Sequence, residues 1–368
     1  MAVNSGLEGV VAAETRLSDV DGERGELVIA GYPVGEIAGR ATFEEMTWLL
    51  WHGRLPDAAE LETFRADLAA RRELPRATLD LLHACAERAL DPMDVLRMGA
   101  GTLSLDPADS KEAEAIVARC PAIVATYWRL SRGEPIVAPR QDLDHAANFL
   151  YMLGGTVPDA ERVRGLETYL NTVIDHGLNA STFTARVITS TGSDLVSAVV
   201  GAIGALKGPL HGGAPGPALD MVFEIGEASR AEAILRRKIE SGEKLMGFGH
   251  RVYKVRDPRA DVLAEAAERM YTRAGDMALY SLARAVEATA LRLLEEYKPG
   301  RRLQTNVEFY TALLLHGLGL EVPLFTPTFA LSRVSGWIAH ALEQRRANRI
   351  IRPQSTYTGP RDRRYSPA

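Results

Sequence analysis

Apolar residues recur every three or four positions along most of this chain, which is the spacing of one face of an α-helix. The exception is the beginning, where residues 14–32 alternate apolar and polar side chains around Asp21 and Gly22. That alternation, centred on an Asp-Gly pair, predicts a small β-hairpin. Strands and helices do not alternate after it, so we predict an all-α fold with an N-terminal hairpin rather than a doubly wound sheet.

Capping residues and glycines divide the helical pattern into separate helices. Thr42 can cap a helix that stops at Gly53, and Asp57 can cap the next one. The pattern predicts helices over residues 43–51, 58–72, 76–89, 110–130, 143–153, 159–176, 194–206, 218–226, 230–241, 260–271, 278–296, 307–318 and 329–346. Residues 350–368 are rich in Pro and Arg, and form either a frayed tail or an arm reaching a neighbouring subunit.

Composition and charge narrow the class of protein. A chain of 368 residues, 46% of them hydrophobic, can bury a core large enough for one large domain and a smaller one. Its 43 basic and 48 acidic residues nearly balance, which argues against nucleic-acid binding. No leader opens the chain, and its most apolar stretch, residues 195–206, is too short to span a membrane. We therefore expect a cytoplasmic protein in which Cys85 and Cys120 stay reduced.

Several common functional motifs are absent. The sequence has no GxxxxGK[ST] loop and no GxGxxG between a strand and a helix, which argues against a nucleotide loop. None of its eight histidines forms an HxxxH or HExxH pair, so no zinc site is predicted. No GxSxG elbow occurs either.

Two glycine-rich stretches carry candidate chemistry. His211 ends a Gly-Pro-Leu run and precedes two glycines, which would let backbone N–H groups approach a ligand; alternatively it is a surface histidine in a helix–helix turn. His250 follows Gly-Phe-Gly and precedes Lys254, Arg256 and Arg259. That loop suits phosphates or carboxylates, unless it is only a solvated basic loop.

The third candidate is an acid at a helix start. Asn306 can cap a helix, which places Glu308 in the first turn of an apolar segment. The alternative to a catalytic role is that Glu308 only stabilises the helix, because an acid in the first turn offsets the helix macrodipole by roughly 0.3–1 kcal/mol.

Taken together these stretches resemble the citrate synthase family, with the segments in the order expected for it. The matching segments are GLNASTFTARVITST, GALKGPLHGGA, MGFGHRVYKVRDPRA, TNVEFY, FALSRVSGWIAHALEQ and RIIRPQSTYTGP. The resemblance spans nearly the whole chain. It implies a helical fold of two domains closing over a cleft, with residues 1–211 and 314–368 in the large domain and residues 212–313 in the small one.

The resemblance also implies a mechanism. In this family an acetyl thioester loses an α-proton and its enol attacks the ketone of oxaloacetate. By resemblance, His211 donates a hydrogen bond to the thioester carbonyl while Glu308 removes the proton, so that no free enolate forms. His250 polarises the ketone and protonates the developing alkoxide.

Binding residues follow from the same resemblance. The two carboxylates of oxaloacetate suit guanidinium partners. His176, Arg259 and Arg333 resemble the family residues that contact oxaloacetate, and Arg352 resembles one supplied across the interface of a homodimer. The residues that resemble the coenzyme A recognition loop are Met246, Gly247, Phe248, Gly249 and Lys254. No metal or permanent cofactor is implied, because acetyl-CoA is a substrate.

Two positions depart from the commonest family pattern. Glu308 stands where Asp is usual, and its additional methylene would move the carboxylate by roughly 1 Å. Pro215 removes a side-chain amide and a backbone N–H near His211. Both departures resemble a sub-branch described as citrate or 2-methylcitrate synthase.

Three functions therefore stay open. The first is citrate synthase, an acyltransferase of the tricarboxylic acid cycle. The second is 2-methylcitrate synthase, which uses propionyl-CoA; one methyl group changes discrimination by only about 1–3 kcal/mol. The third is a weakly active or inactive paralogue that binds coenzyme A and a dicarboxylate. The chain lacks the additional N-terminal region of larger, NADH-regulated members, so we expect a dimer without NADH inhibition.

Overall fold

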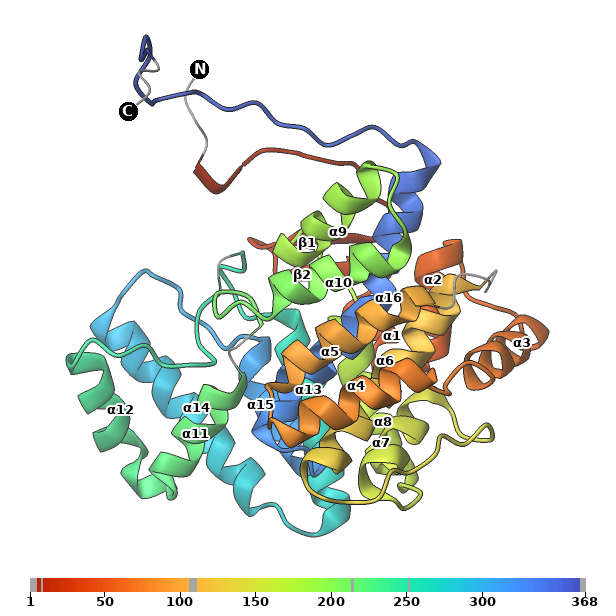
Figure 1. The fold of residues 1–368 in the computed structure, drawn as a ribbon. Coiled ribbons are helices and arrows are strands. Elements are labelled where there is room, and N and C mark those ends of the chain that lie inside the picture. The colour runs from red at the N-terminus through yellow and green to blue at the C-terminus, as the bar shows by residue number, and fades with distance from the viewer. Residues whose placement is uncertain (1–4, 8, 106–110, 213–214, 251, 365–368) are drawn as a thin grey trace.

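The computed structural model describes residues 5–7, 9–105, 111–212, 215–250 and 252–364, and these are mostly helical (Figure 1). The prediction of an all-α fold is confirmed. The α-helices are α1 (Val34–Ile37), α2 (Phe43–His52), α3 (Ala58–Ala69), α4 (Arg76–Glu87), α5 (Pro92–Gly101), α6 (Glu112–Ser131), α7 (His145–Gly154), α8 (Ala160–Val173), α9 (Ala180–Ser190), α10 (Leu195–Leu206), α11 (Pro215–Ile225), α12 (Ala231–Glu240), α13 (Pro258–Ala274), α14 (Ala278–Tyr297), α15 (Val307–Gly317) and α16 (Phe325–Arg346). Short 3-10 helices are η1 (Ser5–Leu7), η2 (Thr102–Leu105), η3 (Ala228–Arg230) and η4 (Val322–Leu324).

The predicted N-terminal hairpin is present. Strand β1 (Ser18–Asp21) pairs antiparallel with β2 (Glu26–Ile29), and Ser18 lies opposite Ile29. A short third strand, β3 (Tyr32–Pro33), extends the sheet in the order β1-β2-β3 and was not predicted. A strand of two residues is too short to show an alternating pattern.

The hairpin turn packs closely against a loop far along the chain. A Cβ atom on Gly22 would lie 2.2 Å from the carbonyl oxygen of Val252, so only glycine fits there. The carbonyl of Gly22 also accepts a hydrogen bond from the backbone N–H of Lys254 at 2.8 Å. The hairpin therefore supports the loop that follows His250.

Helix ends follow the capping signals in the sequence. Thr42 accepts from the N–H of Glu45, whose carboxylate accepts from the N–H of Thr42 in return, and Asp57 forms the same reciprocal cap for α3. Helix α2 ends at Gly53, which adopts φ of 75°.

Helices α1, α5 and α9 were not predicted. In α5, glycines interrupt the apolar pattern, but a Cβ atom on Gly99 would lie 2.8 Å from Ile123, so glycine permits close packing on α6. In α9 the buried face includes Ser181, Thr182 and Arg186. A helix face that is buried through polar side chains has no apolar period to detect.

The helix predicted over residues 159–176 ends three residues earlier than expected. Helix α8 ends at Val173, and the carbonyl of Val173 accepts a hydrogen bond from Nε of Arg333 at 2.7 Å. Because this partner comes from α16, no local signal could show where α8 ends. The early end turns His176 out of the helix.

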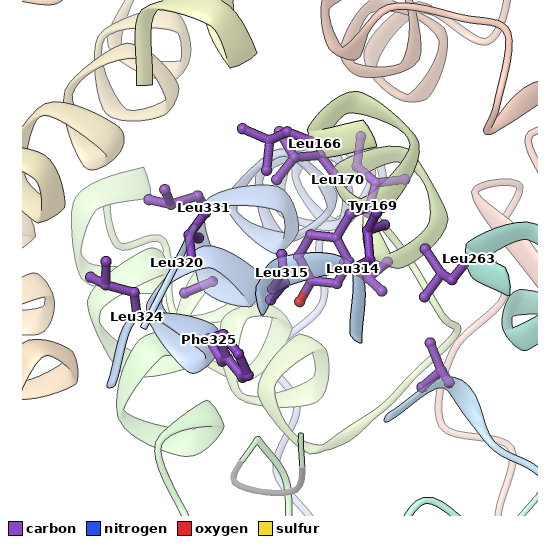
Figure 2. Packing of buried hydrophobic residues seen from close by; sticks show 14 of the residues in the cluster. Leu166, Tyr169, Leu170, Leu263, Leu314, Leu315, Leu320, Leu324, Phe325 and Leu331 are labelled. Carbon is purple, nitrogen blue, oxygen red and sulfur yellow. The ribbon is translucent and has the colours of Figure 1, made fainter. Parts of the chain in front are cut away.

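Helix α16 is the central element of the core, and most of its side chains from Phe325 to Ala341 are buried. It packs against α2, α6, α8, α9 and α10. The helices α11, α12 and α14 form a group at one side of the molecule (Figure 1). Figure 2 shows residues of α8, α15, η4 and α16 in one apolar cluster, including Leu166, Tyr169, Leu170, Leu314, Leu315, Leu324 and Leu331.

In the part of the chain that the structure describes, no single helix has the length and hydrophobicity needed to cross a membrane. Helix α15 and the segment Val322–Arg346 satisfy those two criteria only as a pair, and that pair is bent by 119°.

Candidate active site

A cavity of about 930 Å³ lies where α8, α9, α13, α15 and α16 converge. All but one of the residues predicted for catalysis or oxaloacetate binding line it: His176, His211, His250, Arg259, Glu308 and Arg333. The exception is Arg352, which is exposed on the segment that follows α16. The tertiary fold thus brings together residues that are far apart in the sequence.

The backbone beside His176 is anchored by a buried polar network. Asp175 is fully buried and accepts hydrogen bonds from Oγ of Ser18 at 2.5 Å and from Nε2 of His340 at 3.2 Å. Nη1 of Arg186 donates to Nδ1 of His340 at 2.9 Å, so the proton of a neutral His340 lies on Nε2. Burial alone would raise the pKa of Asp175, but His340 and the other donors lower it, which keeps the carboxylate charged.

His211 is held by residues of α9 and α16. Its Nε2 lies 2.8 Å from Oγ of Ser181, and that hydroxyl accepts a hydrogen bond from the indole N–H of Trp337 at 3.1 Å. Oγ of Ser181 also lies 2.8 Å from the side-chain oxygen of Asn179, the N-cap of α9. Burial, followed by the charge of Arg333, lowers the pKa of His211. The ring is therefore neutral at physiological pH.

His250 is also neutral, and its surroundings define its tautomer. The backbone N–H groups of Val252 and Tyr253 both lie 3.1 Å from Nδ1. Nδ1 must accept these hydrogen bonds, so the proton lies on Nε2. Burial, and then the charge of Arg259, lowers the pKa of His250 to about 4. The neutral ring can therefore donate a hydrogen bond from Nε2.

Glu308 lies in the first turn of α15, as the sequence predicts. The side chain of Asn306 caps the helix by accepting from the N–H of Glu308 at 3.0 Å. Burial raises the pKa of Glu308 to about 7, and Arg259 only partly opposes this shift. A partly buried carboxyl with such a pKa is suited to accept a proton at neutral pH. An acid that only offset the helix macrodipole would not need to be buried or to have a raised pKa.

Arg259 is positioned by a carboxylate. Asp257 is fully buried and bonds Nε and Nη2 of Arg259 at 3.0 and 2.8 Å, a bidentate pair. It also caps α13 and accepts from the N–H of Val307 at 3.2 Å. Burial would raise the pKa of Asp257, but Arg259 lowers it, so both groups are charged. Asp257 thereby holds together the starts of α13 and α15.

Arg333 is the second buried cation of the cavity. It is 1% exposed, its Nε is bonded to the carbonyl of Val173, and its guanidinium carbon lies 4.8 Å from the ring centre of Phe329. Burial, together with the charge of Arg259, lowers its pKa to about 10. It remains cationic at neutral pH, so the cavity carries two guanidinium groups that can bind an anion.

The glycine-rich loop before His250 is paired with the segment before α15. The N–H of Gly249 donates to the carbonyl of Gln304 at 2.7 Å, and the carbonyl of Gly247 accepts from the N–H of Asn306 at 2.9 Å. Gly247 has φ of 88°, and a Cβ atom on it would lie 2.9 Å from Phe309. The glycines therefore allow close packing on α15.

Of the residues predicted to bind coenzyme A, only Gly249 lines the cavity.

Helix α11 begins at Pro215, where a missing N–H costs nothing. Residues 213 and 214 before it lie outside the described ranges. No group of three or more potential metal ligands occurs among the described residues. Cys85 and Cys120 are buried and unpaired.

Sequence reasoning did not single out several residues that shape the site, among them Ser181, Tyr253 and Asp257. Asp257 precedes a proline and an arginine, a recognisable N-cap signal, but nothing local shows that its carboxylate holds Arg259. The side chains of Ser181 and Tyr253 contact His211 and His176, which are remote from them in the sequence.

Comparisons with known proteins identify similar sequences and a similar structure. Residues 6–354 match the family described as “Citrate synthase, C-terminal domain”. The chain is 42% identical to a citrate synthase of Haloferax volcanii, with 98% of this chain and 97% of the relative covered. It is 40% identical to a 2-methylcitrate synthase of Mycobacterium tuberculosis, with 98% and 92% covered.

A solved structure has the same fold. It is the citrate synthase of Thermoplasma acidophilum in a ternary complex with carboxymethyl coenzyme A and oxaloacetate, with a TM-score of 0.88, 30% identity, and 100% of this chain and 98% of that chain covered. The fold and site thus define an acyltransferase of helical architecture. The chain belongs to the citrate synthase family.

Proposed function

We propose that this protein is a citrate synthase, which condenses acetyl-CoA with oxaloacetate and water to give citrate and coenzyme A. The observation that carries the proposal is the composition of one cavity: a carboxyl with a pKa of about 7, neutral histidines and two buried guanidinium groups. The carboxyl can remove a proton from a weak carbon acid while the histidines donate hydrogen bonds to the reacting carbonyl groups. The two guanidinium groups can bind a dianionic substrate.

The reaction begins with proton transfer. Glu308 takes a proton from the methyl group of the thioester while His211 donates a hydrogen bond to the thioester carbonyl. The α-carbon of this hydrogen-bonded enolate then attacks the ketone carbon of oxaloacetate, and His250 gives its Nε2 proton to the ketone oxygen. Water finally cleaves the citryl thioester, which releases citrate and the free thiol of coenzyme A.

Oxaloacetate binding uses the charged part of the cavity. Arg259 and Arg333 bind its carboxylates, and His176 adds a neutral hydrogen-bond donor. Asp257 already holds Nε and Nη2 of Arg259, so Nη1 is the guanidinium nitrogen that Asp257 leaves for a carboxylate of the ligand. Because the histidines are neutral, the positive charges that balance the two carboxylates of oxaloacetate come from Arg259 and Arg333.

Coenzyme A recognition is assigned to the glycine-rich loop, through Met246, Gly247, Phe248, Gly249 and Lys254. The N–H of Gly249 and the carbonyl groups of Gly247 and Gly249 are bonded to Gln304 and Asn306, so the coenzyme would be contacted by the backbone N–H groups of Gly247 and Phe248 and by the side chains of the loop. We also propose that residues 212–313 form a small domain that closes over the large domain of residues 1–211 and 314–368. Acetyl-CoA is a substrate, and no metal or permanent cofactor is part of this mechanism.

We propose a homodimer in the cytoplasm. Arg352 is exposed and does not line the cavity of its own chain. A role for Arg352 in oxaloacetate binding is consistent with that position if the segment after α16 reaches the site of a second copy.

The alternative substrate is propionyl-CoA. The similarity to a 2-methylcitrate synthase is nearly as high as that to a citrate synthase, and one methyl group in a cavity of this size is a small difference. A weakly active paralogue is disfavoured by the pKa of Glu308, since an inactive site has no need of a buried carboxyl.

Thiol release with oxaloacetate and either acetyl-CoA or propionyl-CoA tests the proposal. We expect release with both donors and a higher kcat/KM for acetyl-CoA. A higher kcat/KM for propionyl-CoA would reassign the protein as a 2-methylcitrate synthase. Release with neither donor would leave only a binding role.

A further inference from the structure

Tyr253 lies behind two of the proposed site histidines. It is 2% exposed, and its ring centre is 4.8 Å from that of His250 and 5.6 Å from that of His176. The guanidinium carbon of Arg259 lies 5.7 Å from the same ring centre. Tyr253 is not among the residues that line the cavity, so it would act on a substrate only through its neighbours.

We propose that Tyr253 is a positioning residue that sets the tautomers of both histidines. Its backbone N–H acts on His250, and its phenol hydroxyl acts on His176. The tautomers follow from the hydrogen-bond contacts and the burial of these groups, and they do not depend on the proposed function. Only their effect on oxaloacetate binding rests on the function proposed above.

The backbone N–H of Tyr253 acts on His250. Together with the N–H of Val252 it donates to Nδ1 of His250, each at 3.1 Å. A backbone amide cannot accept a hydrogen bond through its nitrogen, so Nδ1 is unprotonated. Nη2 of Arg259 lies 3.4 Å from Nε2 and would favour the opposite tautomer, but two shorter backbone contacts outweigh one at the limit of hydrogen-bond distance.

The phenol of Tyr253 acts on His176. Its Oη lies 3.0 Å from Nε2 of His176. Burial raises the pKa of Tyr253 above its usual value, so the hydroxyl keeps its proton. Burial, and then Arg259 and Arg333, lowers the pKa of His176 well below its usual value, so that ring is neutral.

The direction of this hydrogen bond follows from the two groups. A phenol is a stronger donor than acceptor, and an unprotonated imidazole nitrogen is a good acceptor. Among the described residues, the hydroxyl of Tyr253 forms its hydrogen bond with His176. Tyr253 therefore donates to Nε2, and the single proton of His176 lies on Nδ1.

As a consequence, the two histidines can both act as hydrogen-bond donors to a ligand in the same cavity. His250 presents Nε2–H and His176 presents Nδ1–H, so each neutral ring can donate one hydrogen bond to an oxygen of oxaloacetate. In the opposite tautomer, His176 would have no proton on Nδ1 and would present a lone pair to an anionic ligand. The close contact between Gly22 and Val252 supports the backbone that carries this arrangement.

The tautomers can be measured in the wild-type enzyme without any kinetics. Two-dimensional nitrogen–proton NMR of protein labelled in histidine distinguishes the two neutral tautomers, and a His176→Asn variant assigns the His176 signals. We expect the Nδ1–H form for His176 and the Nε2–H form for His250. A His176 ring in the Nε2–H form would overturn the proposal.

Tyr253→Phe removes the hydroxyl and keeps the backbone N–H. We expect His250 to keep its tautomer while His176 populates the Nε2–H form, and the KM for oxaloacetate to rise about three- to tenfold with kcat within about twofold. The matched control is Tyr271→Phe, which removes a buried hydroxyl that donates to the carbonyl of Leu313 at 3.1 Å, outside the cavity. It should change neither signal nor KM.

An unchanged His176 tautomer in Tyr253→Phe would also overturn the proposal, as would an unchanged KM in a variant whose His176 tautomer has changed. Thermal unfolding of both variants reports any loss of folding. If the wild-type enzyme releases no thiol, the proposed function fails, while the NMR result still decides the tautomers.

Discussion

At the residue scale, burial divides the titratable groups of the cavity into two kinds. The imidazoles of His176, His211 and His250 have lowered pKa values and are neutral donors. Glu308 has a raised pKa because the same burial penalises its charged form. The positive charge of the site thus comes from guanidinium groups, and the proton-accepting capacity comes from one carboxyl.

Glu308→Gln should remove the base and leave the shape of the side chain. We expect kcat to fall by about 10²–10⁴-fold. Oxaloacetate affinity, measured by calorimetry, should change little, because Arg259 and Arg333 are untouched. Unchanged turnover would return Glu308 to the role of a helix-dipole partner.

The pKa of Glu308 also predicts a pH dependence. The base works only when ionised, so kcat/KM should fall about tenfold for each pH unit below about 7. The histidines do not oppose this trend, because His250 stays neutral down to a pKa of about 4. The measurement is a pH–rate profile with folding checked at each pH by circular dichroism. A profile that is flat between about pH 5 and 8 would contradict the assignment of Glu308 as the base.

At the scale of elements, α16 links the core to the substrate cavity. Its residue Gly336 packs against the loop that carries His176: a Cβ atom there would lie 2.3 Å from the carbonyl oxygen of Ile174 and 3.2 Å from the carboxylate of Asp175. Arg333, one turn earlier, bonds the end of α8. One helix therefore sets the positions of both His176 and Arg333, the two proposed oxaloacetate-binding residues.

Gly336→Ala should push this loop away from α16. We expect the free energy of unfolding to fall by about 1–3 kcal/mol, as for other overpacked cores. The KM for oxaloacetate should rise as well, because Ile174 is two residues from His176. Chemical denaturation and steady-state kinetics provide the two readouts. Gly154→Ala is the control, since a Cβ atom on that helical glycine meets nothing within 4 Å; an equal effect of both changes would refute the packing argument.

The helix features that were predicted depend on neighbouring residues, and several of those that were missed depend on distant ones. Helices α2 and α3 carry their caps in adjacent residues, and the sequence predicts where both begin. Helix α9 buries polar side chains, and α8 ends on a hydrogen bond from Arg333. Those features depend on partners more than a hundred residues away, which local spacing does not contain.

At the scale of the whole molecule, the proposed dimer makes the site composite. The segment after α16 leaves the body of the molecule as an extended chain (Figure 1), and Arg352 lies on it. If each copy supplies Arg352 to the other, two differently inactivated copies should complement each other.

Co-expression of Arg352→Ala with Glu308→Gln tests this exchange. In a mixed dimer, one site combines an intact Glu308 with an intact Arg352 from the other chain, and the second site lacks both. Random pairing should restore about a quarter of the wild-type sites. If Arg352 serves its own chain, activity stays at the level of the separate variants. Light scattering should show a dimer throughout, and a hexamer would contradict the proposed assembly.

The sequence by itself determined the hairpin, most of the helices and the resemblance to citrate synthases, because apolar spacing, caps and motifs are properties of neighbouring residues. It also supplied the candidates His211, His250 and Glu308. Tertiary structure alone decided their chemical states. The pKa of Glu308 depends on burial and on Arg259 from another helix, and the tautomer of His250 depends on the backbone of a folded loop. Burial and hydrogen-bond partners exist only once distant segments have packed together.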